Sequence, residues 1–121
     1  MTLGIAAVTI DCRNAQTLAE FWSAALGMEI DRNGPPVSEF FASIGRENRE
    51  PGAQPMMFIQ VPEHKTLKNR VHLDLEASDR EVEVARLIEL GATHVHDKEE
   101  WGFRWTTLAD PEGNEFCVAT H

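Results

Sequence analysis

The residues best placed to do chemistry lie on one short stretch of the chain, residues 70–77. Apolar and polar residues alternate along it, which is the period of a β-strand with one buried face. His72, Asp74 and Glu76 fall on the polar face and bring one imidazole and two carboxylates into a row. Such a face can be the wall of a polar cavity or an ordinary solvated sheet surface, and the pattern alone leaves both interpretations open.

The elements that must position this strand follow it directly. Asp79 is typical of a helix N-cap, apolar residues then recur at helical spacing, and Gly91 is typical of a helix end. Three further strands are predicted, separated first by a charged turn over residues 97–102 and then by a tight turn over residues 110–113. These strands are residues 93–96, 103–109 and 114–120.

The first half of the chain shows the same order of elements. A strand over residues 3–12 leads to Asn14, a typical N-cap, and to a helix that ends at Gly27. Phe21 and Trp22 lie on its apolar stripe and are predicted to be core. Three strands follow, over residues 28–31, 37–45 and 55–61.

The chain therefore reads as two copies of a strand–helix–three-strand module, residues 1–65 and 67–121. One module alone would expose the apolar face of its sheet. We expect a single α+β domain, residues 1–121, in which two βαβββ modules form a cup-shaped mixed sheet with the helices outside.

Composition limits the possible partners. With 121 residues, 42% of them hydrophobic, the chain suits one domain with a real core. Its formal charge of −9 disfavours nucleic acid and anionic membranes. No apolar run is long enough to span a bilayer, and the N-terminus lacks the pattern of a secretory signal. Two cysteines far apart are too few for a disulfide framework, so we expect a cytoplasmic protein.

Several motifs resemble one known family. These are the repeated module itself, the helix end at residues 24–27, the strand at 71–75 and the Asp-Pro-Glu-Gly-Asn-Glu-Phe turn at 110–116. Together they resemble the glyoxalase, bleomycin-resistance protein and extradiol dioxygenase superfamily, also called the vicinal oxygen chelate superfamily. The chain is similar in particular to its glyoxalase-like domain branch.

The resemblance implies where a metal would bind. Enzymes of the superfamily hold a divalent ion in the cup, with ligands from the first and last strand of each module. In this chain those four places fall on Ala7, Gln60, His72 and Cys117. Alanine offers no electron pair and glutamine is a weak ligand, so we expect a degenerate site without a metal. A two-residue shift gives the alternative set of His72, Glu115 and Gln60, which would hold one Zn, Ni, Mn or Fe ion.

The same resemblance implies that a ligand binds in the cup. Cys117 could be a nucleophile beside His72, and it could equally be a small half-apolar wall, which is the interpretation we adopt. Aromatic rings beside polar groups suit a small planar molecule, although the same rings could instead fill the cup or seal a dimer interface. The predicted binding residues are His72, Gln60, Cys117, Glu115, Asp74, Phe58, Phe103, Trp105 and Thr9.

Three functions remain open on this reasoning. The first is a binding protein for a small organic molecule, and it is the one we expect. The second is a divalent-metal-dependent lyase, isomerase or dioxygenase. The third is a pure interaction module whose cup is filled by its own side chains. We also expect a homodimer, because the edges of a small sheet favour pairing.

Overall fold

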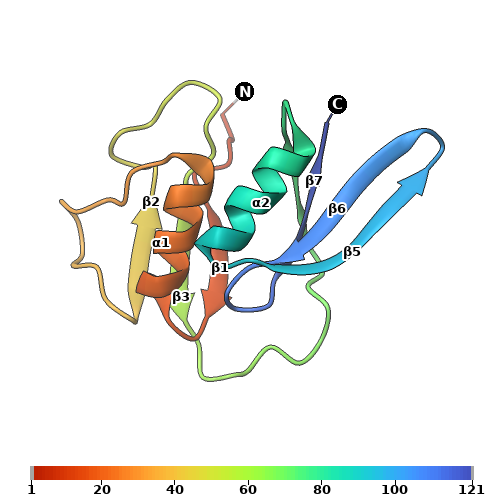
Figure 1. The fold of residues 1–121 in the computed structure, drawn as a ribbon. Helices are drawn as coiled ribbons and strands as arrows, with labels where there is room; N and C mark the ends of the chain where they lie inside the picture. The colour runs from red at the N-terminus through yellow and green to blue at the C-terminus, as the bar shows by residue number, and fades with distance from the viewer. Residues whose placement is uncertain (1, 121) are drawn as a thin grey trace. The chain divides into compact units, whose positions relative to one another are not determined.

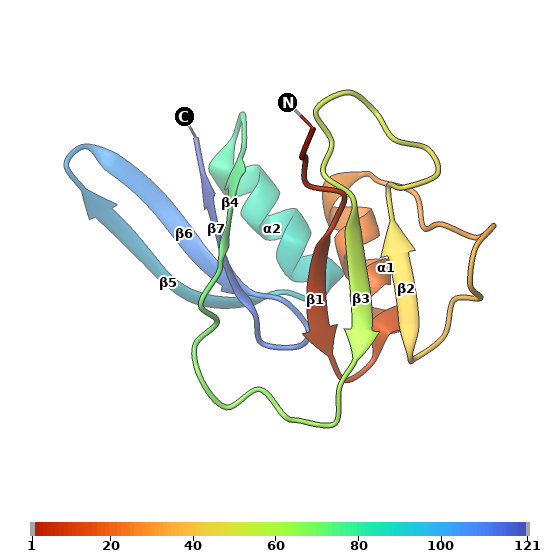
Figure 2. The ribbon, with the colours of Figure 1, turned by 180° about the vertical axis from the view of Figure 1, so that it is seen from behind.

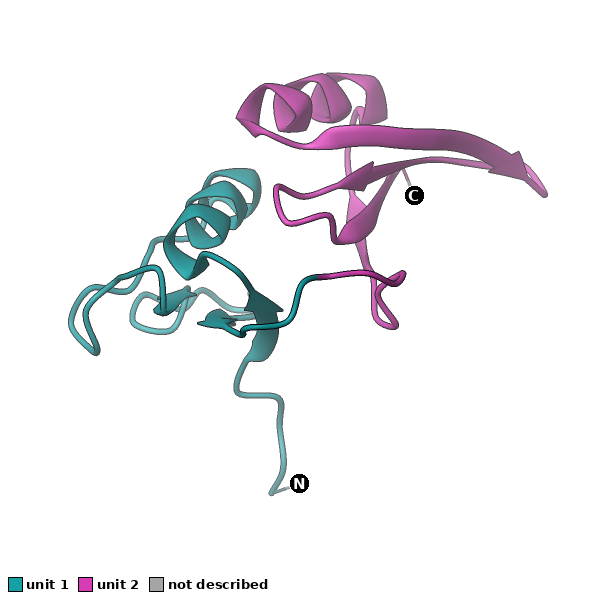
Figure 3. Cartoon of the chain, turned by 90° about the horizontal axis from the view of Figure 1, so that it is seen from below, with its two compact units in different colours: residues 1–64 teal, residues 65–121 magenta. Residues whose placement is uncertain are grey.

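The computed structural model describes residues 2–120 and divides the chain into two compact units. Unit 1 ends at His64 and unit 2 begins at Lys65 (Figure 3). Each unit contains one mixed β-sheet and one α-helix, so the predicted α+β class is confirmed. The joining of the two sheets into one cup stays a prediction. No helix within residues 2–120 has the length and apolar character needed to cross a bilayer.

Unit 1 carries one helix and three strands (Figure 1). The strand order is β1-β3-β2, with β1 parallel and β2 antiparallel to the central β3. The predicted helix caps are confirmed. Asn14 accepts a hydrogen bond from the backbone of Thr17 at 3.1 Å, and Gly27 adopts φ 67°, which favours glycine. The elements are β1 (Val8–Cys12), α1 (Ala15–Leu26), β2 (Phe41–Ile44) and β3 (Met56–Gln60).

The core of unit 1 lies between α1 and its sheet. Leu18, Phe21 and Trp22 are buried on α1, and the two rings meet edge to face with centroids 5.2 Å apart. From the sheet, Met56 and Phe58 are buried on alternate positions of β3, where α1 packs. The prediction that Phe21 and Trp22 are core is therefore confirmed, and within the described part of unit 1 no helix lies on the opposite face of the sheet (Figure 2).

One predicted strand of unit 1 is nearly absent. The strand predicted over residues 28–31 is reduced to an isolated bridge between Ile30 and Ile44. Next to this bridge the buried Asp31 carboxylate accepts hydrogen bonds from Ser43 Oγ at 2.6 Å and from the backbone of Arg46 and Glu47. Backbone hydrogen bonds remain on both sides of the bridge, from Asp31 N–H to the Ser43 oxygen at 3.0 Å and from Gly45 N–H to the Glu29 oxygen at 2.9 Å.

Unit 2 carries one helix and four strands in the order β4-β7-β6-β5. β4 runs parallel to β7, and the remaining neighbours are antiparallel. Asp79 caps α2 by accepting a hydrogen bond from the backbone of Val82 at 3.2 Å, as predicted. The helix lies over β6 and β7, where Phe116 and Val118 are buried. The elements are β4 (Leu73–Glu76), α2 (Arg80–Leu90), β5 (Thr93–Glu100), β6 (Phe103–Ala109) and β7 (Glu115–Ala119).

The β5–β6 hairpin is longer than the sequence predicted, and its turn is shorter. A strand ending at His96 and a turn over residues 97–102 were expected, but β5 continues to Glu100 and only two residues form the turn. Trp101 and Gly102 have φ 50° and 80°, the left-handed values that a two-residue hairpin turn needs. Charged residues occupy both faces of β5, so no hydrophobic alternation marked the strand.

Candidate functional site

Sheet register in unit 2 decides which side chains share the face opposite α2, here called the open face. Asp74 on β4 lies beside Cys117 on β7, Cys117 beside Thr107 on β6, and Thr107 beside His96 on β5. These four residues form one row across the whole sheet, here called the polar row. Phe116 and Val118 alternate with Cys117 and are buried toward α2, which confirms that the polar row faces away from the helix.

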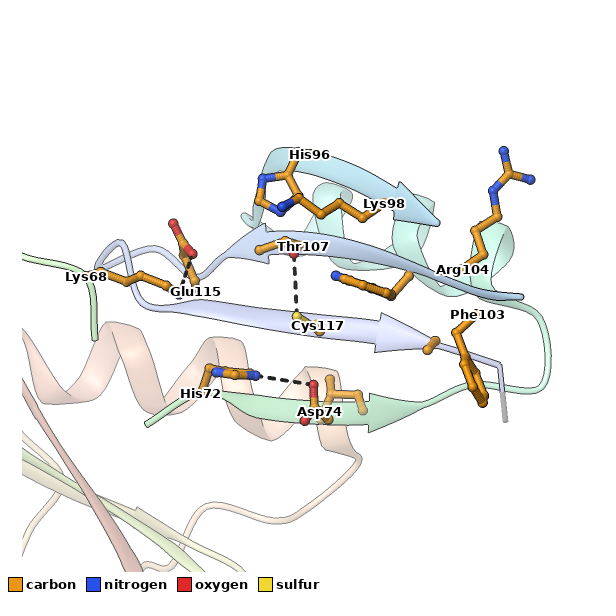
Figure 4. Close-up of a pocket in the computed structure, with 13 residues that line it drawn as sticks. Lys68, His72, Asp74, His96, Lys98, Phe103, Arg104, Thr107, Glu115 and Cys117 are labelled. Carbon is orange, nitrogen blue, oxygen red and sulfur yellow. Dashed lines mark hydrogen bonds and ion pairs between the residues drawn. The ribbon is translucent and has the colours of Figure 1, made fainter. Parts of the chain in front are cut away.

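The open face of unit 2 is hollowed into a cavity of about 510 Å³. Figure 4 shows that side chains reach it from all four strands. Aromatic rings, a thiol, two imidazoles and charged groups contribute to its wall. The lining residues are Lys68, His72, Asp74, Leu75, His96, Lys98, Phe103, Arg104, Trp105, Thr107, Glu115, Cys117 and Ala119.

A cluster of three potential metal ligands lies on the β4–β7 side of this cavity. One ligand atom each from His72, Asp74 and Cys117 lies within 4.8 Å of the others. His72 Nε2 is 3.6 Å from Asp74 Oδ1, and Cys117 Sγ is 3.5 Å from the hydroxyl of Thr107. The cluster therefore offers a nitrogen, an oxygen and a sulfur donor within one small volume.

The segment before β4 is held by side-chain bonds to the start of β7. The Asn69 amide accepts from the Glu115 backbone N–H at 2.9 Å and donates to the Glu115 backbone oxygen at 3.2 Å. It extends the parallel β4–β7 ladder by one rung. Lys68 adds an ion pair with the Glu115 carboxylate at 3.2 Å. These contacts position His72, which follows within a few residues, at the edge of the cavity.

A second polar network lies on the helix-facing side of β5 and β6. Thr106 donates to Asp97 at 2.6 Å, and Arg80 from α2 donates to the same threonine hydroxyl at 2.5 Å. The Thr106 hydrogen bond, followed by His94 and Arg80, lowers the pKa of Asp97 below its usual 3.8. None of these four residues lines the cavity, so the network ties the hairpin to α2.

The structure brings six of the nine predicted binding residues together in this cavity: His72, Asp74, Phe103, Trp105, Glu115 and Cys117. Thr9, Phe58 and Gln60 belong to unit 1. Thr9 is exposed on the face of β1 away from α1. Phe58 is fully buried, so its assignment to a ligand-facing surface is wrong. Its row on β3 faces the helix, because its neighbours in register are the half-buried Ile10 and the buried Ala42.

Gln60 occupies a different place from the one expected. It shares the helix-facing parity of Phe58, and its amide donates to the backbone oxygen of Arg13 at 2.9 Å. Register also shows that it does not correspond to Cys117. Thr9 pairs with Met57 as Asp74 pairs with Cys117, so Met57 is the equivalent residue of unit 1. The sequence prediction put the equivalent of Cys117 at Gln60, three residues after Met57. A shift by an odd number of residues moves a side chain to the other face of the strand.

Seven lining residues were missed by the sequence analysis: Lys68, Leu75, His96, Lys98, Arg104, Thr107 and Ala119. Thr107 follows Trp105 at the strand period, so extending that alternation would have found it. His96 and Lys98 share a face only because β5 continues beyond residue 96, and a bulge shifts the register between His94 and His96. No feature of the sequence marked that bulge.

Each unit pairs its first and last strand in parallel beside one helix, and unit 2 has a cavity on its open face. A family model described as "Glyoxalase-like domain" matches residues 7–119. The chain therefore belongs to the glyoxalase-like domain family, as the motifs predicted. A comparison with curated proteins found no match.

Solved structures share this fold at low sequence identity. A glyoxalase/bleomycin resistance protein/dioxygenase family enzyme from Burkholderia phytofirmans PsJN has a TM-score of 0.72 and 18% identity, with 98% of each chain covered. The fosfomycin resistance protein FosX from Listeria monocytogenes, an E126Q mutant with Mn(II) and 1S,2S-dihydroxypropylphosphonic acid, has a TM-score of 0.74 and 10% identity, covering 98% of this chain and 90% of that one. The bleomycin-binding protein from Streptomyces verticillus, complexed with copper(II)-bleomycin, has a TM-score of 0.62 and 16% identity, covering 100% and 98%.

Proposed function

We propose that the open face of unit 2 binds a small organic molecule. The observation that carries this proposal is the cavity of about 510 Å³, a size typical of small-molecule sites, with aromatic rings and a few convergent polar groups in its wall. Two structural relatives hold small molecules, namely copper(II)-bleomycin and a dihydroxypropylphosphonic acid. Their likeness to this chain supports the proposal at the level of the fold.

The cavity residues have distinct roles in this proposal. Phe103 and Trp105 supply flat apolar surface for a planar part of the ligand. His72 and Thr107 can each donate and accept a hydrogen bond, so they orient its polar groups. Cys117 lies between them and forms a small, half-apolar part of the wall.

A thermal-shift screen of small organic compounds tests this function, with wild type and His72→Ala run together. We expect His72→Ala to leave folding nearly intact, because its side chain is 46% exposed. Binding should weaken by about 1–3 kcal/mol, the cost of leaving a buried polar partner of the ligand unpaired. His94→Ala is the matched control, since His94 is also 46% exposed but lies outside the cavity.

Two results of this screen would contradict the proposal. If His72→Ala unfolds early and every compound found binds it as well as wild type, His72 is a structural residue of β4. If no compound binds wild type, the cavity is not a ligand site.

A second candidate function is a divalent-metal-dependent lyase, isomerase or dioxygenase, favoured by the cluster of His72, Asp74 and Cys117. Three strong ligands with nitrogen, oxygen and sulfur donors fit zinc or iron better than magnesium, and three protein ligands leave a position open for substrate. When bound, such an ion supplies Lewis-acid chemistry. This donor set shares only His72 with the alternative set given by the sequence, since Asp74 and Cys117 stand in place of Glu115 and Gln60.

Calorimetric titration with Zn(II), Fe(II) and Mn(II) tests the metal candidate. It predicts stoichiometric binding of one ion that His72→Ala and Cys117→Ser both weaken strongly, with His94→Ala unchanged. Absence of stoichiometric binding, or equal binding by all variants, would leave the metal-free binding function as the one supported.

We also propose that the protein is a cytoplasmic homodimer. Both sheets end in edge strands, namely β1 and β2 in unit 1 and β4 and β5 in unit 2, and edges favour pairing. Light scattering at micromolar concentration should give twice the chain mass of 13.6 kDa. A mass equal to one chain would contradict the dimer.

A further inference from the structure

Basic residues outnumber acidic ones in the cavity wall, whereas acidic residues outnumber basic ones in the whole chain. The whole chain has 20 acidic residues and 11 lysines and arginines. The cavity wall instead contains three cations, Lys68, Lys98 and Arg104, against two carboxylates, Asp74 and Glu115. Two histidines add further hydrogen-bond donors. Basic residues are thus concentrated where a ligand would contact the protein.

Most of these charges already have a partner. Lys68 pairs with Glu115 at 3.2 Å, and Arg104 lies 3.9 Å from Glu99, which is not part of the wall. Within residues 2–120, by contrast, no carboxylate oxygen lies within 4.0 Å of the Lys98 amine. The cavity therefore contains one cation whose charge no neighbouring side chain neutralises.

The surroundings of Lys98 suit a planar molecule. Sheet register places Lys98 beside Trp105 and His96 beside Thr107, all on the open face. Figure 4 shows His96 and Lys98 together on β5, at the rim of the sheet opposite His72 and Asp74 on β4. An ammonium, an imidazole and a hydroxyl thus lie next to one large aromatic ring.

We propose that the cavity selects a small planar organic anion, with its anionic group at Lys98 and His96 and its ring against Trp105. This inference rests on the proposed small-molecule function and specifies its ligand class. Charge-assisted hydrogen bonds are stronger than neutral ones, so the anionic group gains most from an unneutralised amine. The acidic surface elsewhere does not prevent this, because salt screens charges beyond about 8 Å in physiological conditions. An extended polyanion would still meet that surface.

Three probes with one ring system test the charge preference: naphthoate, naphthamide and naphthamidinium. They are similar in size and planarity but carry a negative, a neutral and a positive group. We expect naphthoate to bind about tenfold more tightly than naphthamide, and naphthamidinium to bind most weakly. Dissociation constants come from calorimetry at one fixed salt concentration.

Two variants assign the preference to Lys98. Lys98→Gln should weaken naphthoate binding about tenfold and leave naphthamide binding unchanged. Arg86→Gln is the control, since it removes the same charge from α2, where Arg86 pairs with Glu83 and does not line the cavity. β5 is an edge strand and Lys98 is exposed, so the fold should tolerate the change.

The outcomes separate this inference from the proposed function. If naphthamide or naphthamidinium binds as tightly as naphthoate, the anion preference is wrong and the small-molecule site stands. If Arg86→Gln weakens naphthoate binding as much as Lys98→Gln does, net charge and not Lys98 explains the preference, which also overturns the inference. If none of the three probes binds and the compound screen also finds nothing, both proposals fail.

Discussion

Units 1 and 2 share a framework and differ on their open faces. Both begin with a strand that is parallel to the last strand of the unit, and both enter their helix through an N-cap with nearly the same backbone, φ −138° at Asn14 and φ −135° at Asp79. Both helices cover one face of their sheet (Figure 1). The elements that build the fold are therefore alike in the two units.

The open faces carry different chemistry. Where unit 2 places His72, Asp74 and Cys117, register gives Ala7, Thr9 and Met57 in unit 1. Unit 2 also has the long β5–β6 hairpin, whereas in unit 1 the corresponding pairing is reduced to one bridge. A repeated module can therefore keep the order and pairing of its strands and its capped helix while one copy alone carries imidazole, carboxylate and thiol groups on its open face.

The largest loss of folding stability is expected for a substitution on the helix-facing side of unit 1. Phe58→Ala should lower the free energy of unfolding by about 3–5 kcal/mol, because Phe58 is fully buried and its loss leaves a cavity. Phe103→Ala on the open face of unit 2 is the control, and with 63% of its surface exposed it should cost less than about 1 kcal/mol. Urea denaturation of both variants measures the difference.

Similar free energies of unfolding for Phe58→Ala and Phe103→Ala would contradict this prediction. That result would mean that β3 does not present Phe58 to the helix, and the assignment of faces in unit 1 would have to be reversed.

Much of the framework could be predicted from sequence because its signals are local. The caps at Asn14 and Asp79 and the alternation through residues 71–77 depend on neighbouring residues only. The positions of His72 and Asp74 in the cavity wall followed from the same alternation. Phe58 and Gln60 did not, because their strand is apolar on both faces and the choice of buried face depends on register with β1 and β2. The course of β5 depended on a bulge and a two-residue turn that no local pattern marked.

Each unit also contains one buried carboxylate that holds a turn, and these two should behave alike. Asp110 accepts hydrogen bonds from the backbone of Glu112 and Asn114, both at 2.9 Å, as Asp31 does for residues 46 and 47. We expect Asp31→Ala and Asp110→Ala each to cost about 1–3 kcal/mol by leaving buried donors unsatisfied. Asp74→Ala on the open face should cost little, because its side chain is exposed.

Thermal unfolding of these three variants checks the comparison. A loss for Asp74→Ala as large as for Asp110→Ala would show that the open-face carboxylate stabilises the fold, which would remove the distinction between framework and site.

A smaller loss of folding stability is expected when Asp97, on the helix-facing side of unit 2, is replaced. Its pKa lies below 3.8 in the folded protein, so its ionised form stabilises the fold above that pH, and this contribution is lost as the pH falls through the lowered pKa. Asp97→Asn should therefore cost at most about 1 kcal/mol at neutral pH, since the group is exposed. The difference from wild type should disappear at a pH well below 3.8. A pH series of melting temperatures measures it, and a difference that is independent of pH would contradict the assignment.

We propose that a ligand binds on the open face of unit 2 and not on that of unit 1. Backbone amide chemical shifts of isotope-labelled protein, followed during titration with the tightest compound from the screen, test it directly. We expect the largest changes in chemical shift at His72, Thr107 and Cys117, with Thr9 and Met57 nearly unchanged. Changes centred on Thr9 and Met57, or spread evenly over both units, would contradict it.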